Sequence, residues 1–184
     1  MGYYILSQDK TFRNQVVIDK SRLPEELRQL GYPRRKNYSE WNNSISGDKC
    51  FNLVVKSNAD NYYSDFIENP YLLISDELKK VFISYESNLS CNCTILSDRG
   101  NKIQKVYWFC ALEMADCLGT DSEFYPDHSI KELILDRKRI GNRKIFQVAG
   151  IREKRFIASL DVVESILRRP FTGICVEKAA VRVN

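Results

Sequence analysis

The chain contains only one histidine among its 184 residues, and this scarcity limits the catalytic machinery that it can assemble. A serine or cysteine nucleophile needs a base that titrates near neutral pH, usually an imidazole. Only His128 could supply one, within the polar, turn-like segment Tyr125-Pro126-Asp127-His128-Ser129. We therefore interpret His128 as an exposed loop residue, with a catalytic base as the alternative.

Motifs for phosphates and metals are also missing. Neither Gly-x-x-x-x-Gly-Lys-Ser/Thr nor Gly-x-Gly-x-x-Gly occurs, so no phosphate-binding loop is predicted. Cys91-x-Cys93 is too closely spaced for the usual zinc pair, and one histidine cannot complete the familiar ligand sets. Cysteines at period two on a strand are typical small core residues. We predict no cofactor, no metal site and no catalytic residue.

Long hydrophobic runs are absent as well. No stretch of about 20 apolar residues is present, so no membrane-spanning helix is expected. The first ten residues lack the basic and apolar regions of a signal peptide. These observations predict a cytoplasmic protein whose six cysteines are reduced thiols.

The residues that are present suit a folded domain. Hydrophobic residues make up 43% of the chain and charged residues 28%, with ten tyrosines and nine phenylalanines. The net charge is only +4, whereas dedicated nucleic-acid domains usually carry a strong basic stripe. A nucleic-acid partner is therefore an alternative rather than the main prediction.

One pattern occurs twice, over residues 71–96 and 156–176. Each copy has an apolar run, a serine that can cap a helix, an amphipathic helical pattern and a second apolar run. The serines are Ser75 and Ser159. The apolar helix faces are Leu78, Val81, Phe82 and Tyr85 in the first copy, and Val162, Val163, Ile166 and Leu167 in the second. Two strand–helix–strand units are predicted.

The segment 102–118 is the most hydrophobic, and both of its alternating residue sets are apolar, which predicts a central strand buried on both faces. Further strands are expected at 3–6, 16–18, 51–55, 130–135 and 144–148, a short helix at 24–30 and a basic turn at 139–142. The predicted class is α+β with a mixed sheet. We expect a single domain over 1–184, with 1–60 as a candidate N-terminal lobe and 61–184 as the main body.

Cations and aromatic residues alternate between Tyr32 and Trp41. Tyr, Trp and Arg are preferred anchors of protein interfaces, so the candidate partner-binding residues are Tyr32, Arg34, Arg35, Tyr38 and Trp41. The same mixture can bind nucleic acid by stacking bases, or form a solvated loop. Asp116, which ends an apolar run, is interpreted as a turn residue with a functional site as the alternative.

Three stretches carry a resemblance to a known family. They are residues 73–82, the segment 107–118 with its Asp-Cys-Leu ending, and residues 134–146 continuing into 156–176. In this order they resemble a family of bacterial immunity proteins from polymorphic-toxin and contact-dependent systems, formerly a domain of unknown function. The resemblance implies a cytoplasmic protein that binds and neutralises a cognate toxin and performs no catalysis.

Two other hypotheses stay open. The chain could be a nucleic-acid-binding module that uses 34–41 and 137–144, or an enzyme centred on His128. The first predicts binding that weakens steeply with salt. The second predicts an activity that His128→Ala abolishes.

Overall fold

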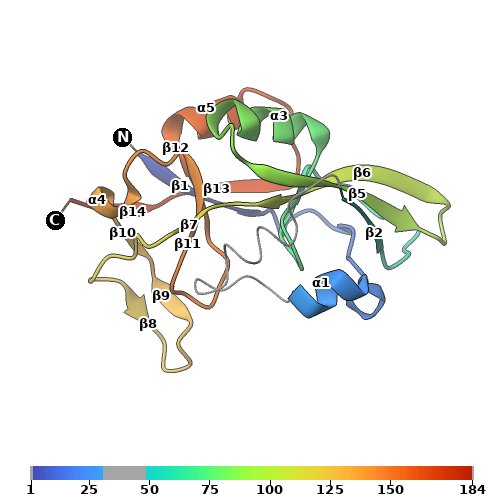
Figure 1. Cartoon of the computed structure of the whole chain (residues 1–184), viewed down its shortest axis with the longest axis horizontal. Helices are drawn as coiled ribbons and strands as arrows, with labels where there is room; N and C mark the ends of the chain where they lie inside the picture. Colours follow the sequence, from blue (N-terminus) through green and yellow to red (C-terminus); the bar gives the residue numbers. More distant parts are fainter. Residues whose placement is uncertain (1, 31–48, 184) are drawn as a thin grey trace.

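The computed structural model describes residues 2–30 and 49–183. Within these ranges the chain forms two five-stranded sheets, with two helices side by side across the top of the view in Figure 1. Two further pairs of short strands complete the mixed α+β fold, which confirms the predicted class. None of the described helices has the length and apolar character that a membrane crossing requires.

The elements follow one another along the chain with these bounds. The strands are β1 (Tyr3–Gln8), β2 (Cys50–Val54), β3 (Phe66–Ile67), β4 (Leu73–Ile74), β5 (Ser90–Asp98), β6 (Ile103–Ala111), β7 (Met114–Ala115), β8 (Glu123–Phe124), β9 (Ile130–Glu132), β10 (Ile134–Asp136), β11 (Ile145–Val148), β12 (Phe156–Ser159), β13 (Ile174–Lys178) and β14 (Ala180–Arg182). The helices are α1 (Glu25–Leu30), α3 (Asp76–Tyr85), α4 (Arg137–Ile140) and α5 (Leu160–Leu167), with a 3₁₀ turn at Lys20–Arg22.

The first sheet has the strand order β2-β5-β6-β4-β3. Helix α3 connects β4 to β5, and β6 lies between these two strands and is antiparallel to both. Strand β2 joins the outer side of β5 in parallel. The strand–helix–strand unit predicted over 71–96 is therefore confirmed, with a strand from outside the unit inserted between its own two.

The second sheet has the order β13-β1-β12-β11-β7 and repeats this topology. Helix α5 connects β12 to β13, and β1 lies between them, again antiparallel to both. The preceding strand, β11, flanks β12 as β3 flanks β4. The repeated sequence pattern thus corresponds to one topological unit used twice, and the second prediction is confirmed as well.

The two helix starts differ. Ser75 Oγ accepts a hydrogen bond from the N–H of Leu78 at 3.3 Å, as predicted for a capping serine. Ser159 has the backbone conformation of an N-cap, but its hydroxyl donates to the Asp161 carboxylate and accepts from no helix N–H. Ser159 is therefore the N-cap residue, as predicted, but it makes no side-chain capping bond, because its hydroxyl is oriented toward the Asp161 carboxylate.

One hydrophobic core joins the two sheets beneath the helices. Phe66 of β3 and Phe156 of β12 meet edge to face with ring centroids 5.9 Å apart, and both are fully buried. The buried faces of α3 and α5 belong to the same cluster. Leu167, predicted to lie on the buried stripe, is 68% exposed at the end of α5. That prediction is wrong: Leu167 is the last residue of α5, and its side chain faces solvent while Val162, Val163 and Ile166 are buried.

Strand β6 has buried residues on both faces in its second half. Tyr107 and Phe109 pack into a cluster on one side, and Cys110 packs into the helix-side core on the other. The prediction of a doubly buried central strand is confirmed there. Its first half is exposed, as Val106 at 58% shows. The strand also ends at Ala111, and the chain then crosses to the second sheet, where β7 pairs with β11.

Several short predictions need correction. Residues 16–18 form only isolated bridges, since Ile18 pairs singly with Val55. The strand expected at 130–135 divides into β9 and β10, which belong to different strand pairs. The basic turn expected at 139–142 is partly helical, because the short helix α4 continues to Ile140 and is capped by Gly141 with φ +64°. In the first 60 residues, β1 lies in the second sheet and β2 in the first.

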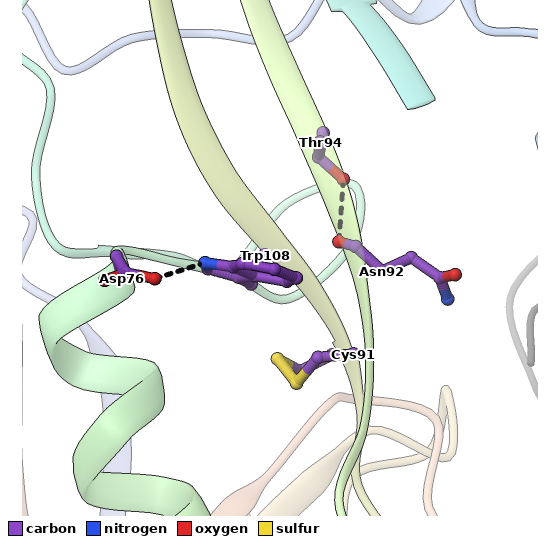
Figure 2. The surroundings of a disulfide bond; sticks show 6 residues. Asp76, Cys91, Asn92, Thr94 and Trp108 are labelled. Carbon is purple, nitrogen blue, oxygen red and sulfur yellow. Dashed lines mark hydrogen bonds between the residues drawn. A yellow bond between two sulfur atoms is a disulfide. The ribbon is translucent and has the colours of Figure 1, made fainter. Parts of the chain in front are cut away.

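Two of the six cysteines form a disulfide. Cys91 of β5 and Cys110 of β6 are direct partners with Cα atoms 4.3 Å apart, and Figure 2 shows their surroundings. The Cys110 N–H donates to Leu72 on the other side, so this is a non-hydrogen-bonded pair, the type with the shorter Cα separation of about 4.5 Å. The expectation of six reduced thiols is wrong for this pair, because that expectation came from the missing export signal and took no account of the register that brings Cys91 and Cys110 together.

Candidate partner-binding surface

The partner-binding residues predicted from the sequence, Tyr32, Arg34, Arg35, Tyr38 and Trp41, lie outside the described residues. Their role stays a prediction. The other basic segment, 137–144, lies within the described ranges, as do His128 and Asp116. These positions can be compared directly with what the sequence predicted for them.

The cations of the segment 137–144 are largely engaged with neighbouring elements. Arg143 contacts Glu113 at 2.6 Å, Lys144 contacts Asp161 at 2.6 Å, and Arg139 contacts Asp136 at 3.5 Å. Arg137 lies over the Tyr3 ring, 5.5 Å from its centroid, and donates to the carbonyl of Gly141. These charges stabilise the fold locally, which leaves little of the segment to neutralise a nucleic-acid backbone.

His128 lies at the tip of the turn between β8 and β9, exposed and with a φ of +62°. Its N–H donates to the carbonyl of Tyr125 at 2.9 Å. In the described part of the chain, no ionisable side chain is hydrogen-bonded to its imidazole. Asp116 is exposed in the loop after β7. The exposed-loop interpretation of His128 is confirmed, and the catalytic alternative stays a prediction.

The β8–β9 hairpin carries two large exposed aromatic side chains. Phe124 is 42% exposed and Tyr125 is 52% exposed. In Figure 1 the hairpin projects from the body on the side away from α3 and α5. Exposed aromatic side chains on a projecting element are the type of residue that anchors protein interfaces.

The hairpin tip is held by a close set of hydrogen bonds. Asp127 accepts from both the N–H and the hydroxyl of Ser129, at 3.1 and 2.6 Å, and the N–H of Tyr125 donates to the Ser129 carbonyl. The bonds from the Ser129 hydroxyl and N–H keep the pKa of Asp127 below its ordinary value. Lys131 pairs with Glu123 across the two strands at 2.7 Å. The aromatic side chains are therefore presented on an ordered turn.

The base of the hairpin is tied to the main body. Ser122 Oγ donates to the Ile134 carbonyl at 2.9 Å and accepts from the Ile134 N–H at 3.1 Å. The N–H of Gly119 donates to the same carbonyl, and a Cβ at Gly119 would lie only 2.9 Å from that oxygen. The N–H of Ile130 donates to Glu153 at 2.9 Å. These contacts fix the direction in which the hairpin projects.

A hollow of about 300 Å³ lies beside β9, between the hairpin and the edge of the second sheet. Its lining combines three cations with two carboxylates on a partly apolar floor: Lys131, Arg155, Lys178, Glu132, Glu177, Ile5, Ile130, Leu133 and Ala180. We call this hollow together with Phe124, Tyr125 and His128 the β8–β9 surface. It combines aromatic anchors with a polar, charged rim, which is the usual composition of a protein interface.

The most strongly perturbed carboxylate of the described chain has a structural role. Asp98, at the end of β5, accepts from Ser57 at 2.6 Å, Asn61 at 2.7 Å and Asn101 at 2.9 Å. These bonds, led by the Ser57 hydroxyl, hold its pKa far below its ordinary value. Because these donors come from the loops that flank the β5–β6 hairpin, Asp98 orders those loops.

Metal ligands do not gather in the parts of the chain that the structure describes: no group of three or more His, Cys, Asp or Glu side chains is placed to hold an ion. Cys91 is taken up by the disulfide, so the Cys91-x-Cys93 pair cannot act as a pair of ligands while that bond is intact.

Sequence reasoning missed the β8–β9 surface, although a signal was present. Phe124-Tyr125-Pro126 places two aromatic residues inside a polar turn, where no core strand or helix can bury both. The residue of this turn that the sequence suggests as functional is His128.

Comparison of the chain with protein-family models gives no match, and comparison with curated protein sequences gives none either.

Proposed function

We propose that the protein is a binding protein that neutralises a cognate toxin by stoichiometric contact, and that the β8–β9 surface takes part in that contact. The observation that supports this is the ordered, projecting hairpin that presents Phe124 and Tyr125 to solvent. A turn whose backbone is ordered before binding loses less conformational entropy on association than a flexible loop would. Blocking a toxin needs such a complementary surface rather than a nucleophile.

The charge of the hairpin favours a protein partner over nucleic acid. Residues 121–132 carry four acidic residues and one lysine: Asp121, Glu123, Asp127, Glu132 and Lys131. Binding of single-stranded nucleic acid combines aromatic stacking with a positively charged groove, whereas this hairpin is acidic. It suits a partner that presents a cationic patch.

The identification of the partner as a toxin depends on the family resemblance of residues 73–82, 107–118 and 134–176. A cytoplasmic location and the absence of catalysis, expected from the composition of the chain, are also implied by this resemblance, and both remain part of the proposal. The disulfide bears on the location, because cystines persist mainly in oxidising compartments. Fractionation of cells that express the full chain, followed by thiol alkylation, tests the location directly.

The central experiment is co-expression of the full chain with the product of the adjacent upstream gene. We expect the two proteins to co-purify in equal amounts, and growth inhibited by the neighbour to be restored. A double variant, Phe124→Ala with Tyr125→Ala, should weaken the complex by roughly 30-fold or more if both are interface anchors. Leu167→Ala is the matched control, because it removes an exposed apolar side chain from α5.

Three outcomes would count against the proposal. If the adjacent upstream gene encodes no toxin-like domain, the identification of the partner as a toxin fails, while the β8–β9 surface can still be tested for binding. Equal loss of affinity in the hairpin variant and in Leu167→Ala contradicts the assignment of the surface. Binding of nucleic acid that falls steeply with salt would favour the alternative hypothesis based on 34–41 and 137–144.

A further inference from the structure

Four cysteines gather on one face of the first sheet. Cys91 and Cys93 are two positions apart on β5 and so point to the same side. Cys110 faces Cys91 from β6, and Cys50 faces Cys93 from β2. The disulfide Cys91–Cys110 therefore has a pair of thiols next to it, one ladder position along β5 on the same face.

The register brings Cys50 and Cys93 within disulfide reach. They are direct partners in the parallel pair β2–β5, and neighbouring strands lie about 4.8 Å apart. Cystines usually join Cα atoms about 4.4–6.8 Å apart, a range that includes this strand spacing. Burial raises the pKa of the Cys93 thiol, and the neighbouring Cys50 thiol raises it further, against the nearby Lys79 ammonium.

The two thiols differ in their access to solvent. Cys50 is exposed at the start of the edge strand β2, whereas Cys93 is half-buried beneath α3, opposite Trp108. A small disulfide in solution can thus reach Cys50 first, and Cys93 is placed to resolve the product. The other thiols lack this arrangement, because Cys117 is buried and Cys175 is exposed on β13, in the other sheet.

We propose that Cys50 and Cys93 form a dithiol redox site that low-molecular-weight disulfides convert to a second cystine. The Cys50 thiolate attacks one sulfur of glutathione disulfide, forming a mixed disulfide and releasing one glutathione thiolate. Cys93 then loses its proton to solvent and attacks the Cys50 sulfur, which releases the second glutathione. Two electrons pass from the protein dithiol to glutathione disulfide, and two reduced glutathiones leave.

The product would cross-link three adjacent strands. Cys91–Cys110 already joins β5 to β6, and Cys50–Cys93 would join the edge strand β2 to β5. An edge strand such as β2 is hydrogen-bonded to a neighbour on one side only. A covalent bond to β5 therefore restricts β2 more than it would restrict a central strand. The site thereby makes the attachment of β2 dependent on the thiol–disulfide balance of the surroundings.

The test uses the purified full chain and oxidised glutathione as the probe. After incubation, remaining thiols are alkylated in denaturant and the peptides are identified by mass spectrometry. We expect a Cys50–Cys93 linked peptide, a bound glutathione on the exposed Cys175, the loss of the three alkylatable thiols that these products consume, and full reversal by dithiothreitol. The oxidised chain should also unfold at a higher temperature than the same chain after reduction of this bond alone.

Variants separate the two steps. Cys93→Ser should stop the reaction at a stable glutathione adduct on Cys50, and Cys50→Ser should leave Cys93 almost unreacted. A Cys50 that keeps its glutathione in the unsubstituted chain would overturn the proposal. So would a linked peptide that joins Cys93 to Cys91 or Cys110. Circular dichroism of each variant establishes that a negative result does not come from unfolding.

Discussion

The two strand–helix–strand units share one topology but obtain their middle strand differently. The first receives β6 from the segment directly after β5, through a short turn. The second receives β1 from the opposite end of the chain. The first unit is thus completed by local pairing and the second only by long-range pairing, which is slower to form because a long loop must close first. The same local pattern therefore does not imply the same folding history.

The units also differ in local reinforcement. The first has a capping hydrogen bond at Ser75 and a cystine between its strands. Within the described residues, the second has neither, and an acid–base pair between Asp161 and Lys144 stands at its helix start. The contact that unites them is the shared core under α3 and α5, where Phe66 meets Phe156.

The largest expected effect comes from that shared core. Phe156→Ala should destabilise the protein by about 3–5 kcal/mol, because it removes a fully buried ring. Urea denaturation followed by two spectroscopic probes measures this. A double-mutant cycle with Phe66→Ala should give a coupling of about 0.5–1.5 kcal/mol. Two separate unfolding transitions in the unsubstituted chain would show instead that the units fold independently.

Removal of the cystine should weaken the first unit selectively. Replacing Cys91 and Cys110 together by serine should cost about 2–4 kcal/mol, and hydrogen exchange should rise in β5 and β6 before β1 and β12. Cys175→Ser is the control, since it changes an exposed thiol in the second sheet. Equal stability with and without reductant would contradict the disulfide in solution.

Substitutions of the serines at the starts of α3 and α5 compare the two helix starts directly. Ser75→Ala should cost about 1 kcal/mol, and Ser75→Asp should restore stability because aspartate is also a good N-cap acceptor. Ser159→Asp should destabilise, because it buries a second carboxylate beside Asp161. Thermal unfolding at neutral pH compares the three. Equal tolerance of aspartate at both positions would show that the two starts are equivalent after all.

The smallest effect concerns the pair of Asp161 and Lys144. Burial raises the pKa of Asp161, but hydrogen bonds from Lys144 and Ser159 outweigh it and leave the pKa below its ordinary value of 3.8. A lowered folded-state pKa stabilises the protein above that value, and this stabilisation is lost as the pH falls through the folded-state pKa. Lys144→Met should therefore cost at most about 1 kcal/mol at neutral pH, since the pair is partly exposed.

The pH dependence of the free energy of unfolding distinguishes the ion pair of Asp161 and Lys144 from a contribution of side-chain packing alone. The difference in free energy of unfolding between the unsubstituted chain and Lys144→Met should shrink as the pH falls below about 4. Unfolding curves recorded over this range measure it. A difference that is independent of pH would assign the effect to the lost side-chain packing of Lys144.

The candidate site was accessible to sequence reasoning only in part. The polar turn around His128 was correctly expected to be exposed. The aromatic residues before it were not singled out, since a phenylalanine and a tyrosine are on average buried and nothing in their spacing indicates exposure. Whether they are exposed depends on which elements pack around the hairpin, and that is a property of the assembled fold.

Neighbouring residues in the chain specify the two strand–helix–strand units, the cap at Ser75 and the buried face of α3. Side-chain periodicity and capping chemistry are local, so they can be read directly from neighbouring residues. Three features become visible only in the folded chain: β1 completes the second unit, Cys91 pairs with Cys110, and Ser159 bonds to Asp161. The first two depend on contacts between residues distant in the chain, and the third on the orientation of one hydroxyl, and periodicity encodes neither.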